Sequence, residues 1–170
     1  VCFVKRLKCW LCAMLPTRRW RSRSKLLNLP LRVLGKTTLS AAAASTTFTL
    51  SDFTIPAGTR HLAVIWNASK TATADMGLLR FNADTGANYN DQRLTGAVAT
   101  ASAARVTGGT SIQIGNVPTG ANLFGGGMIV IPHYANTANH KAVIAMGGEV
   151  ENRIDAIAGR WANTGAITSI

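Results

Sequence analysis

Cysteine is missing from most of this chain of 170 residues, because Cys2, Cys9 and Cys12 all lie close to the N-terminus. Residues 35–170 therefore have neither disulfides nor a thiolate metal site to support their fold. They also lack a cysteine nucleophile, and none of their serines lies in a Gly-x-Ser-x-Gly elbow. These absences argue against an enzyme, and we expect no catalytic residues, no metal and no cofactor.

Long apolar runs are also missing. The apolar run Cys9–Leu15 is far shorter than the roughly 20 residues that a membrane-spanning helix needs. A cluster of arginines follows it, which is the wrong flank for a signal peptide. We therefore expect no membrane span.

Acidic residues are few and unevenly placed. Residues 1–36 hold ten of the eighteen Lys and Arg residues and no Asp or Glu, whereas the remainder carries eight basic and all seven acidic residues. The net charge of +11 therefore belongs almost wholly to the N-terminal part. We expect residues 1–34 to lie outside the fold, either as an extension from a mis-assigned gene start or as a disordered basic arm.

The rest of the chain is rich in Ala, Gly, Thr and Ser and poor in charge, which is typical of a β-sandwich with many turns. His61–Asn67 has apolar residues on both faces, which predicts a central strand. We expect Met76–Asn82 to pair with it as a hairpin, and residues 91–109 to form a loose loop. The further predicted strands are Ser111–Gly115, Phe124–Pro132, Asn139–Gly148 with alternation at Ala142, Ile144 and Met146, Ala156–Trp161 and Ala166–Ile170.

One stretch runs from a strand into a tight turn. From Leu78 to Tyr89 it reads Leu-Leu-Arg-Phe-Asn-Ala-Asp-Thr-Gly-Ala-Asn-Tyr, and its Asn, Asp and Gly residues are those that favour ordered turns. This string resembles a motif of small β-sandwich structural proteins of tailed bacteriophages, described as tail, collar or minor virion proteins. Four further stretches fit the same pattern in the same order: His61–Val64, Ser111–Gly115, Ile131–Thr137, and Gly159–Trp161 with Ala166–Ile170.

The resemblance covers about Leu34 to Ile170 and implies an all-β, antiparallel, jelly-roll-like sandwich over residues 35–170. It implies a non-enzymatic structural component of a virion, placed in the tail, the fibre or the head decoration. Other virion proteins would be its partners, and we expect a homo-oligomer, with a trimer as the guess. In the family another hairpin usually follows the final Ile-Thr-Ser-Ile segment, so we expect the domain to continue past Ile170.

Two alternatives remain open. β-Sandwiches often present Tyr, Trp and Asn on loops for sugars, and the candidates for a glycan site on a host surface are Tyr89, Asn88, Asn90, Tyr134 and Asn136. The weaker alternative is nucleic-acid contact through the basic segment 5–25, where Arg residues alternate with Trp. A calcium loop at Asp84–Asp91 and a metal pair of His133 and His140 are further interpretations, but ordinary turns explain these residues better.

Overall fold

A computed structural model describes residues 4–14, 31–39, 41–71, 73–120, 122–149 and 151–170. These residues are almost entirely strands and turns, with a single 3-10 turn, η1, at Leu50–Asp52. The strands are β1 (Val4–Met14), β2 (Leu31–Thr38), β3 (His61–Lys70), β4 (Asp75–Leu79), β5 (Tyr89–Ala97), β6 (Thr100–Gly109), β7 (Ile112–Val117), β8 (Gly125–Pro132), β9 (Lys141–Glu149) and β10 (Arg153–Trp161).

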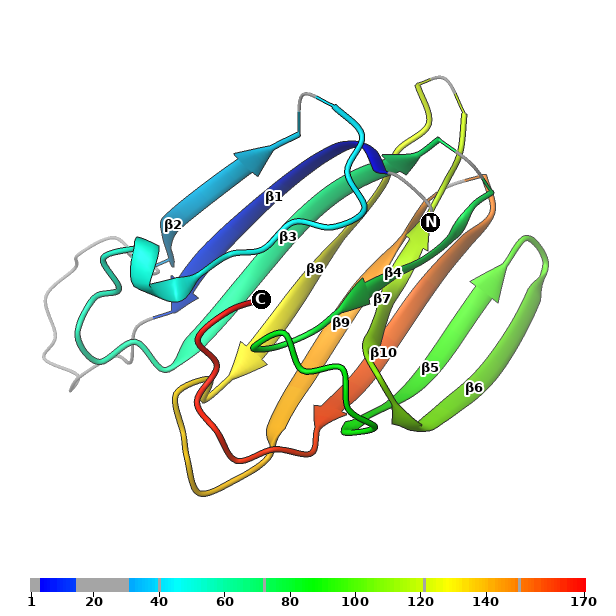
Figure 1. The fold of residues 1–170 in the computed structure, drawn as a ribbon. Helices are drawn as coiled ribbons and strands as arrows, with labels where there is room; N and C mark the ends of the chain where they lie inside the picture. Colours follow the sequence, from blue (N-terminus) through cyan, green and yellow to red (C-terminus); the bar gives the residue numbers. More distant parts are fainter. Residues whose placement is uncertain (1–3, 15–30, 40, 72, 121, 150) are drawn as a thin grey trace, which may run out of the picture.

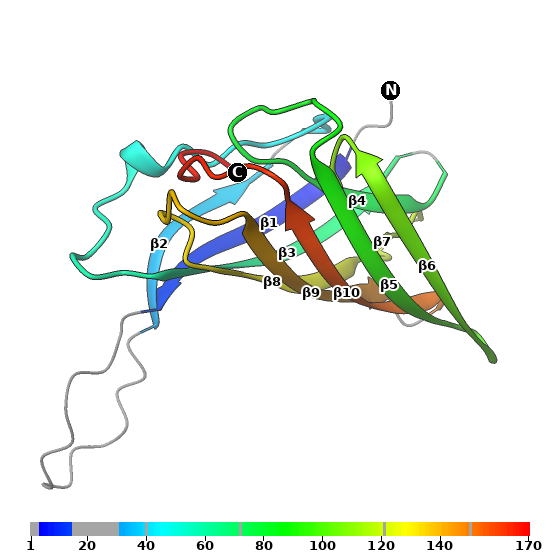
Figure 2. The same ribbon diagram turned by 90° about the horizontal axis from the view of Figure 1, so that it is seen from below.

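The strands form two antiparallel layers of unequal size. One sheet has eight strands in the order β2-β1-β3-β8-β9-β10-β5-β6, and the other consists of β4 and β7. Figure 1 shows the small sheet and the C-terminal segment in front of the large sheet, and Figure 2 shows both on the same side of it. The prediction of an all-β antiparallel sandwich is confirmed.

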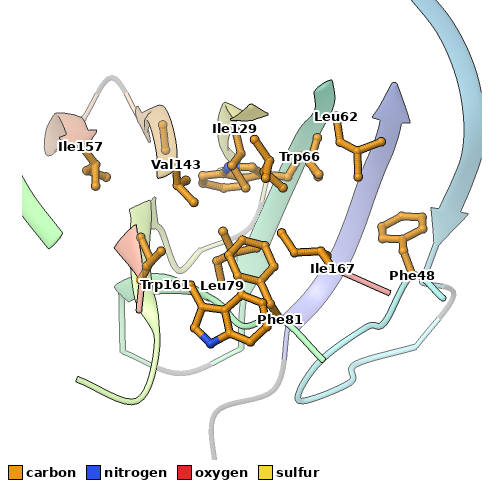
Figure 3. Close-up of a cluster of buried hydrophobic side chains, with 14 of the residues drawn as sticks. Phe48, Leu62, Trp66, Leu79, Phe81, Ile129, Val143, Ile157, Trp161 and Ile167 are labelled. Carbon is orange, nitrogen blue, oxygen red and sulfur yellow. The ribbon is translucent and has the colours of Figure 1, made fainter. Parts of the chain in front are cut away.

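The core lies between these layers. Figure 3 shows Trp66, Ile129, Val143 and Ile157 projecting from the large sheet toward Phe81 and its neighbours. All of these side chains are at most 4 % exposed. Burial of this apolar surface, at about 25 cal/mol per Å², is the main stabilising contribution to such a fold.

The N-terminal part differs from the expectation that the fold begins at residue 35. β1 pairs with β3 from Val4↔Lys70 to Met14↔His61, and β2 pairs with β1 on its other side. Without β1, the edge of β3 would expose a row of unpaired backbone N–H and C=O groups, and the pairing satisfies them. Residues 1–3 and 15–30 lie outside the described residues, so the expectation for them stays a prediction.

β3 is a central strand, as predicted, because β1 and β8 flank it. The predicted hairpin with the following strand is wrong. β4 leaves the large sheet and pairs with β7, from Asp75↔Val117 to Leu79↔Ile112. Leu79 is buried against the core while Leu78 is 57 % exposed, so β4 covers the large sheet with one apolar side.

The prediction of a loose loop over residues 91–109 is also wrong, because β5 and β6 pair along most of this segment. The inward positions of β5 include Asp91, Arg93 and Thr95, which are polar but largely buried. A search for alternating apolar residues therefore finds no strand in this segment. β6 is the outer strand, and most of its side chains are exposed.

β9 alternates as predicted, but the face that carries its larger apolar residues is exposed and the face that carries its smaller ones is buried. Val143 and Ala145 are buried, while Ile144 and Met146 are 58 % and 53 % exposed. The three glycines Gly125–Gly127 lead into β8 through close packing, as predicted. A Cβ on Gly127 would lie 2.5 Å from the Met146 carbonyl oxygen and 2.7 Å from Nε1 of Trp66.

The C-terminal segment forms a bridge instead of the predicted strand Ala166–Ile170. Thr49 and Ser169 form an isolated antiparallel bridge. Phe48 and Ile170 exchange two backbone hydrogen bonds, of 2.7 and 3.0 Å. Ile167 is buried, so the segment closes the core over the large sheet. Among the described residues, no helix has the length and apolarity to cross a membrane.

Candidate functional site

The turn that follows β4 is organised by the carboxylate of Asp84. Its oxygens accept hydrogen bonds from the Trp161 indole N–H at 2.7 Å, the Gly86 backbone N–H at 2.8 Å and the Asn88 side-chain amide at 2.9 Å. Asn82 and Ala83 adopt left-handed φ angles of 53° and 54°, which reverse the chain. Donors from several parts of the chain thus converge on one acid, and we call this arrangement the Asp84 clasp.

The clasp lowers the pKa of Asp84. The bond from Trp161 contributes most, followed by those from Asn88 and Gly86, because each donor stabilises the ionised carboxylate. All three donors belong to the protein itself. The Asp84 clasp therefore stabilises the turn, because the hydrogen bonds that this carboxylate accepts come from residues of the same chain.

Tyr89 does not form the surface platform that the glycan alternative needs. Its side chain is fully buried, with its ring 6.4 Å from the rings of Phe81 and Trp161. Its hydroxyl accepts from the Phe81 backbone N–H at 3.0 Å and lies 3.2 Å from the Asp84 carbonyl oxygen. Burial raises the pKa of this phenol. Tyr89 is a core residue, and its proposed role in sugar stacking is corrected.

The two asparagines next to Tyr89 also have internal partners. Asn88 donates to Asp84, and Asn90 accepts from the Gly108 backbone N–H at 3.0 Å. Asp91 is buried and accepts from the Gln113 backbone N–H at 3.2 Å. The oxygens of the suggested calcium loop thus point to separate protein donors and do not surround one point.

Asn82 connects the same turn to the C-terminal segment. Its Oδ1 accepts from the backbone N–H groups of Thr168 and Ser169, at 2.7 and 3.1 Å, and its amide donates to the Ala166 carbonyl at 2.8 Å. More than eighty residues of chain separate these partners. The motif from Leu78 to Tyr89 therefore holds the end of the chain against the core.

The other two predicted glycan residues lie in the turn between β8 and β9. Tyr134 and Asn136 are both half-buried there. Asn136 lines a shallow hollow of about 290 Å³ together with His133, Asn139 and His140. Its Oδ1 accepts from the backbone N–H groups of Ala138 and Asn139, so this oxygen shapes the turn. Asn136 therefore borders this hollow, whereas Tyr134 packs against the core.

A third histidine, His61, contacts one of the two histidines that line this hollow. The rings of His61 and His133 are 5.0 Å apart and edge to face, and the His133 backbone N–H donates to Nδ1 of His61 at 3.4 Å. The pKa of His61 is lowered, first by burial and then by the charges of His133 and Arg60. Sequence reasoning missed this pair because His61 begins β3 and His133 lies in the turn after β8, 72 residues further along the chain.

A buried ion pair on β10 was also missed. The side chain of Asp155 is fully buried on β10, bound by two nitrogens of Arg153 at 2.7 and 3.0 Å and contacted by the Thr95 hydroxyl on β5. Arg93 lies 3.7 Å from the same acid. The cross-strand pair Thr95↔Asp155 brings these groups together across the sheet, which sequence spacing could not reveal.

No part of the described chain gathers three or more His, Cys, Asp or Glu residues in a way that could hold a metal ion. The suggested pair of His133 and His140 borders the hollow without a third such ligand. Searches of protein families, of curated proteins and of solved structures found no match for this chain.

Proposed function

We propose that this chain is a structural component of a tailed-phage virion that acts through assembly and does not turn over a substrate. The motif from Leu78 to Tyr89, which resembles those proteins, is the observation that carries the proposal. Its polar residues form the Asp84 clasp and the Asn82 contacts, and its aromatic residues lie in the core. The motif residues therefore stabilise the fold, which supports a structural role.

The surface of the large sheet supports the same proposal. Six large apolar side chains on its outer face are between 41 % and 60 % exposed: Ile65, Leu94, Met128, Ile144, Met146 and Ile154. Apolar patches of this extent usually mark surfaces that contact other proteins. A protein embedded in an assembly of other virion proteins and copies of itself would cover them.

Immunogold electron microscopy tests this proposal. Polyclonal antibodies raised against the whole chain are applied to particles from the cells that carry the gene. The proposal predicts gold at one repeated position, on the tail, the fibre or the head. Label restricted to cell debris, with bare particles in the same field, would contradict it.

Glycan recognition is the second candidate function, and the hollow at the β8–β9 turn favours it because His and Asn side chains are among those that line it. Asn136 borders this hollow, and the exposed His133 and His140 add ring nitrogens that can bond sugar hydroxyls. In this form the candidate no longer uses Tyr89. A glycan array should then show binding that His140→Ala reduces at least tenfold while Thr107→Ala, an exposed change on β6, does not. An array with no bound glycan would eliminate this candidate.

A further inference from the structure

The outer face of the large sheet carries an unusual pattern of residue sizes. Cross-strand pairing aligns its residues in rows that run across the strands. In one row lie Ile65, Met128, Met146, Ala156 and Leu94, from β3, β8, β9, β10 and β5. The next row, two residues along each strand, contains Asn67, Gly126, Gly148, Ile154 and Gly96.

Each of four neighbouring strands has one large and one small residue in these two rows. Met128 lies beside Gly126 on β8, and Met146 beside Gly148 on β9. On β10 the order is reversed, with Ala156 beside Ile154, and on β5 Leu94 lies beside Gly96. The large residues of the first row thus form a ridge, and the glycines of the second row form a groove beside it. On β10 the large residue lies in the second row and the small one in the first.

The groove coincides with a hollow in the surface of the large sheet. It has a volume of about 600 Å³ and is lined by several glycines together with Met146 and Ile154, and Glu149 and Arg153 also border it. Figure 2 shows β4, β7 and the C-terminal segment on the opposite side of the sheet, so these covering segments leave this face open. Within the described chain, no Asp or Glu belongs to either row.

We propose that a second copy of this chain covers this face through a two-fold axis that lies between the two rows and parallel to them. Such an axis exchanges the rows and keeps each strand opposite the same strand of the other copy. Met128 then lies over Gly126 of the second copy, Met146 over Gly148, Ile154 over Ala156 and Leu94 over Gly96. On these four strands each large side chain meets a small one, which is how facing sheets interdigitate, and on β3 Ile65 lies over Asn67.

The area supports a second copy as the occupant. The exposed fractions of the six large side chains, applied to about 200 Å² each, leave roughly 600 Å² of apolar surface. A stable interface buries about 800 Å² on each partner, rims included. Self-association through this axis requires a large residue in one row and a small residue in the other on each strand, and all four strands have this pair. Binding of an unrelated partner does not require the two rows of one face to complement each other.

The proposal extends the virion role by naming one contact, and it does not depend on that role. Sedimentation velocity of the full chain over a range of concentrations measures the association. We expect a dimer, and we expect Gly126→Val to raise its dissociation constant at least tenfold. A Cβ at Gly126 has its closest neighbour, the Trp66 carbonyl oxygen, at 3.4 Å, so this change fills the groove while the protomer still folds. Leu78→Lys, on the exposed side of β4, is the matched control and should leave the dimer unchanged.

An exchange of ridge and groove gives the sharpest test. Gly126→Met alone places two methionines over each other, and Met128→Gly alone leaves a void, so each should weaken the dimer. The double variant restores a large residue opposite a small one, and the dimer should return. Circular dichroism confirms folding, and Leu94→Lys replaces any variant that fails to fold.

A monomer at every concentration would overturn the two-fold contact, as would an oligomer that neither Gly126→Val nor the exchange affects. If a different virion protein covers this face, the chain alone should be a monomer at every concentration. In that case immunogold labelling of particles still decides the virion role by itself.

Discussion

The indole N–H of Trp161 donates to the carboxylate of Asp84 over 2.7 Å, although 77 residues separate them. Trp161 ends β10 in the large sheet, and Asp84 lies in the turn that follows β4 in the covering layer. The bond therefore joins the two layers at the edge of the core. The Phe81 ring, 5.5 Å from the indole ring, packs beside it.

Replacing Asp84 with Asn should destabilise the fold, because the amide is uncharged and its nitrogen cannot accept a hydrogen bond. We expect the melting temperature to fall by several degrees, because hydrogen bonds to an ionised acceptor are stronger than those to an amide. Differential scanning calorimetry measures the change. Asp52→Asn, at an exposed acid in η1, is the matched control and should leave the melting temperature within about 1 °C.

The same clasp predicts acid sensitivity. The pKa of Asp84 is lowered in the folded state, so the unfolded chain binds this proton more readily. The stabilisation is present above the ordinary value of 3.8 and is lost as the pH falls through the lowered folded value. Acid unfolding followed by tryptophan fluorescence should show a transition that Asp84→Asn makes shallower. An unchanged transition would contradict the clasp.

The histidine pair predicts a separate effect at higher pH. The pKa of His61 is lowered by burial, His133 and Arg60, so the folded state resists its protonation. Stability should fall as the pH drops from 6.5 through the lowered folded value, a window above that of Asp84. Urea unfolding at a series of pH values should show a decline that His61→Gln removes and His140→Gln leaves in place.

Two adjacent glycines should respond differently to substitution. A Cβ at Gly127 would clash with the Met146 carbonyl oxygen at 2.5 Å, whereas a Cβ at Gly126 meets no atom closer than 3.4 Å. We expect Gly127→Ala to cost about 2 kcal/mol or more, as overpacking does, and Gly126→Ala to stay within about 1 kcal/mol. Equal effects in urea unfolding would contradict the close approach of β8, β9 and Trp66.

The buried acid on β10 should matter far more than an exposed one. Asp155→Ala leaves Arg153 without its buried partner, and we expect a loss of about 3–5 kcal/mol. Asp52, an exposed acid in η1, provides the comparison. Asp52→Ala should cost less than about 1 kcal/mol in the same unfolding experiment.

The fold class and the central place of β3 could be predicted from the sequence, because alternating and two-sided apolar patterns carry that information. The pairing of β4 with β7 could not, because it joins segments that are not consecutive in the chain. β5 was missed because Asp91, Arg93 and Thr95 occupy its inward positions.

The candidate site was harder to predict for a related reason. Tyr and Asn next to a turn look the same in a sequence whether they face solvent or the core. Only the positions of Phe81 and Trp161 place Tyr89 inside. Nor could the faces of β9 be assigned, because Ile144 and Met146 are larger than the residues that point inward.

Deleting residues 1–34 would not test the nucleic-acid alternative cleanly, because the deletion would remove β1 and part of β2 from the sheet. Point substitutions are the better test. Replacing Arg18, Arg19, Arg21 and Arg23 with Gln keeps both strands. If the segment binds nucleic acid, the affinity should fall steeply with salt and the slope should be reduced in this variant. Binding that the four changes do not affect would contradict the alternative.

The central claim, that the chain is an integral part of a phage particle, is tested most directly by quantitative mass spectrometry of particles separated on a density gradient. Trypsin should release the peptide from Phe81 to Arg93, which contains most of the motif. The account predicts a constant ratio of this peptide to the major capsid protein in every fraction that contains particles. A ratio that varies between fractions, or a peptide confined to fractions without particles, would contradict it.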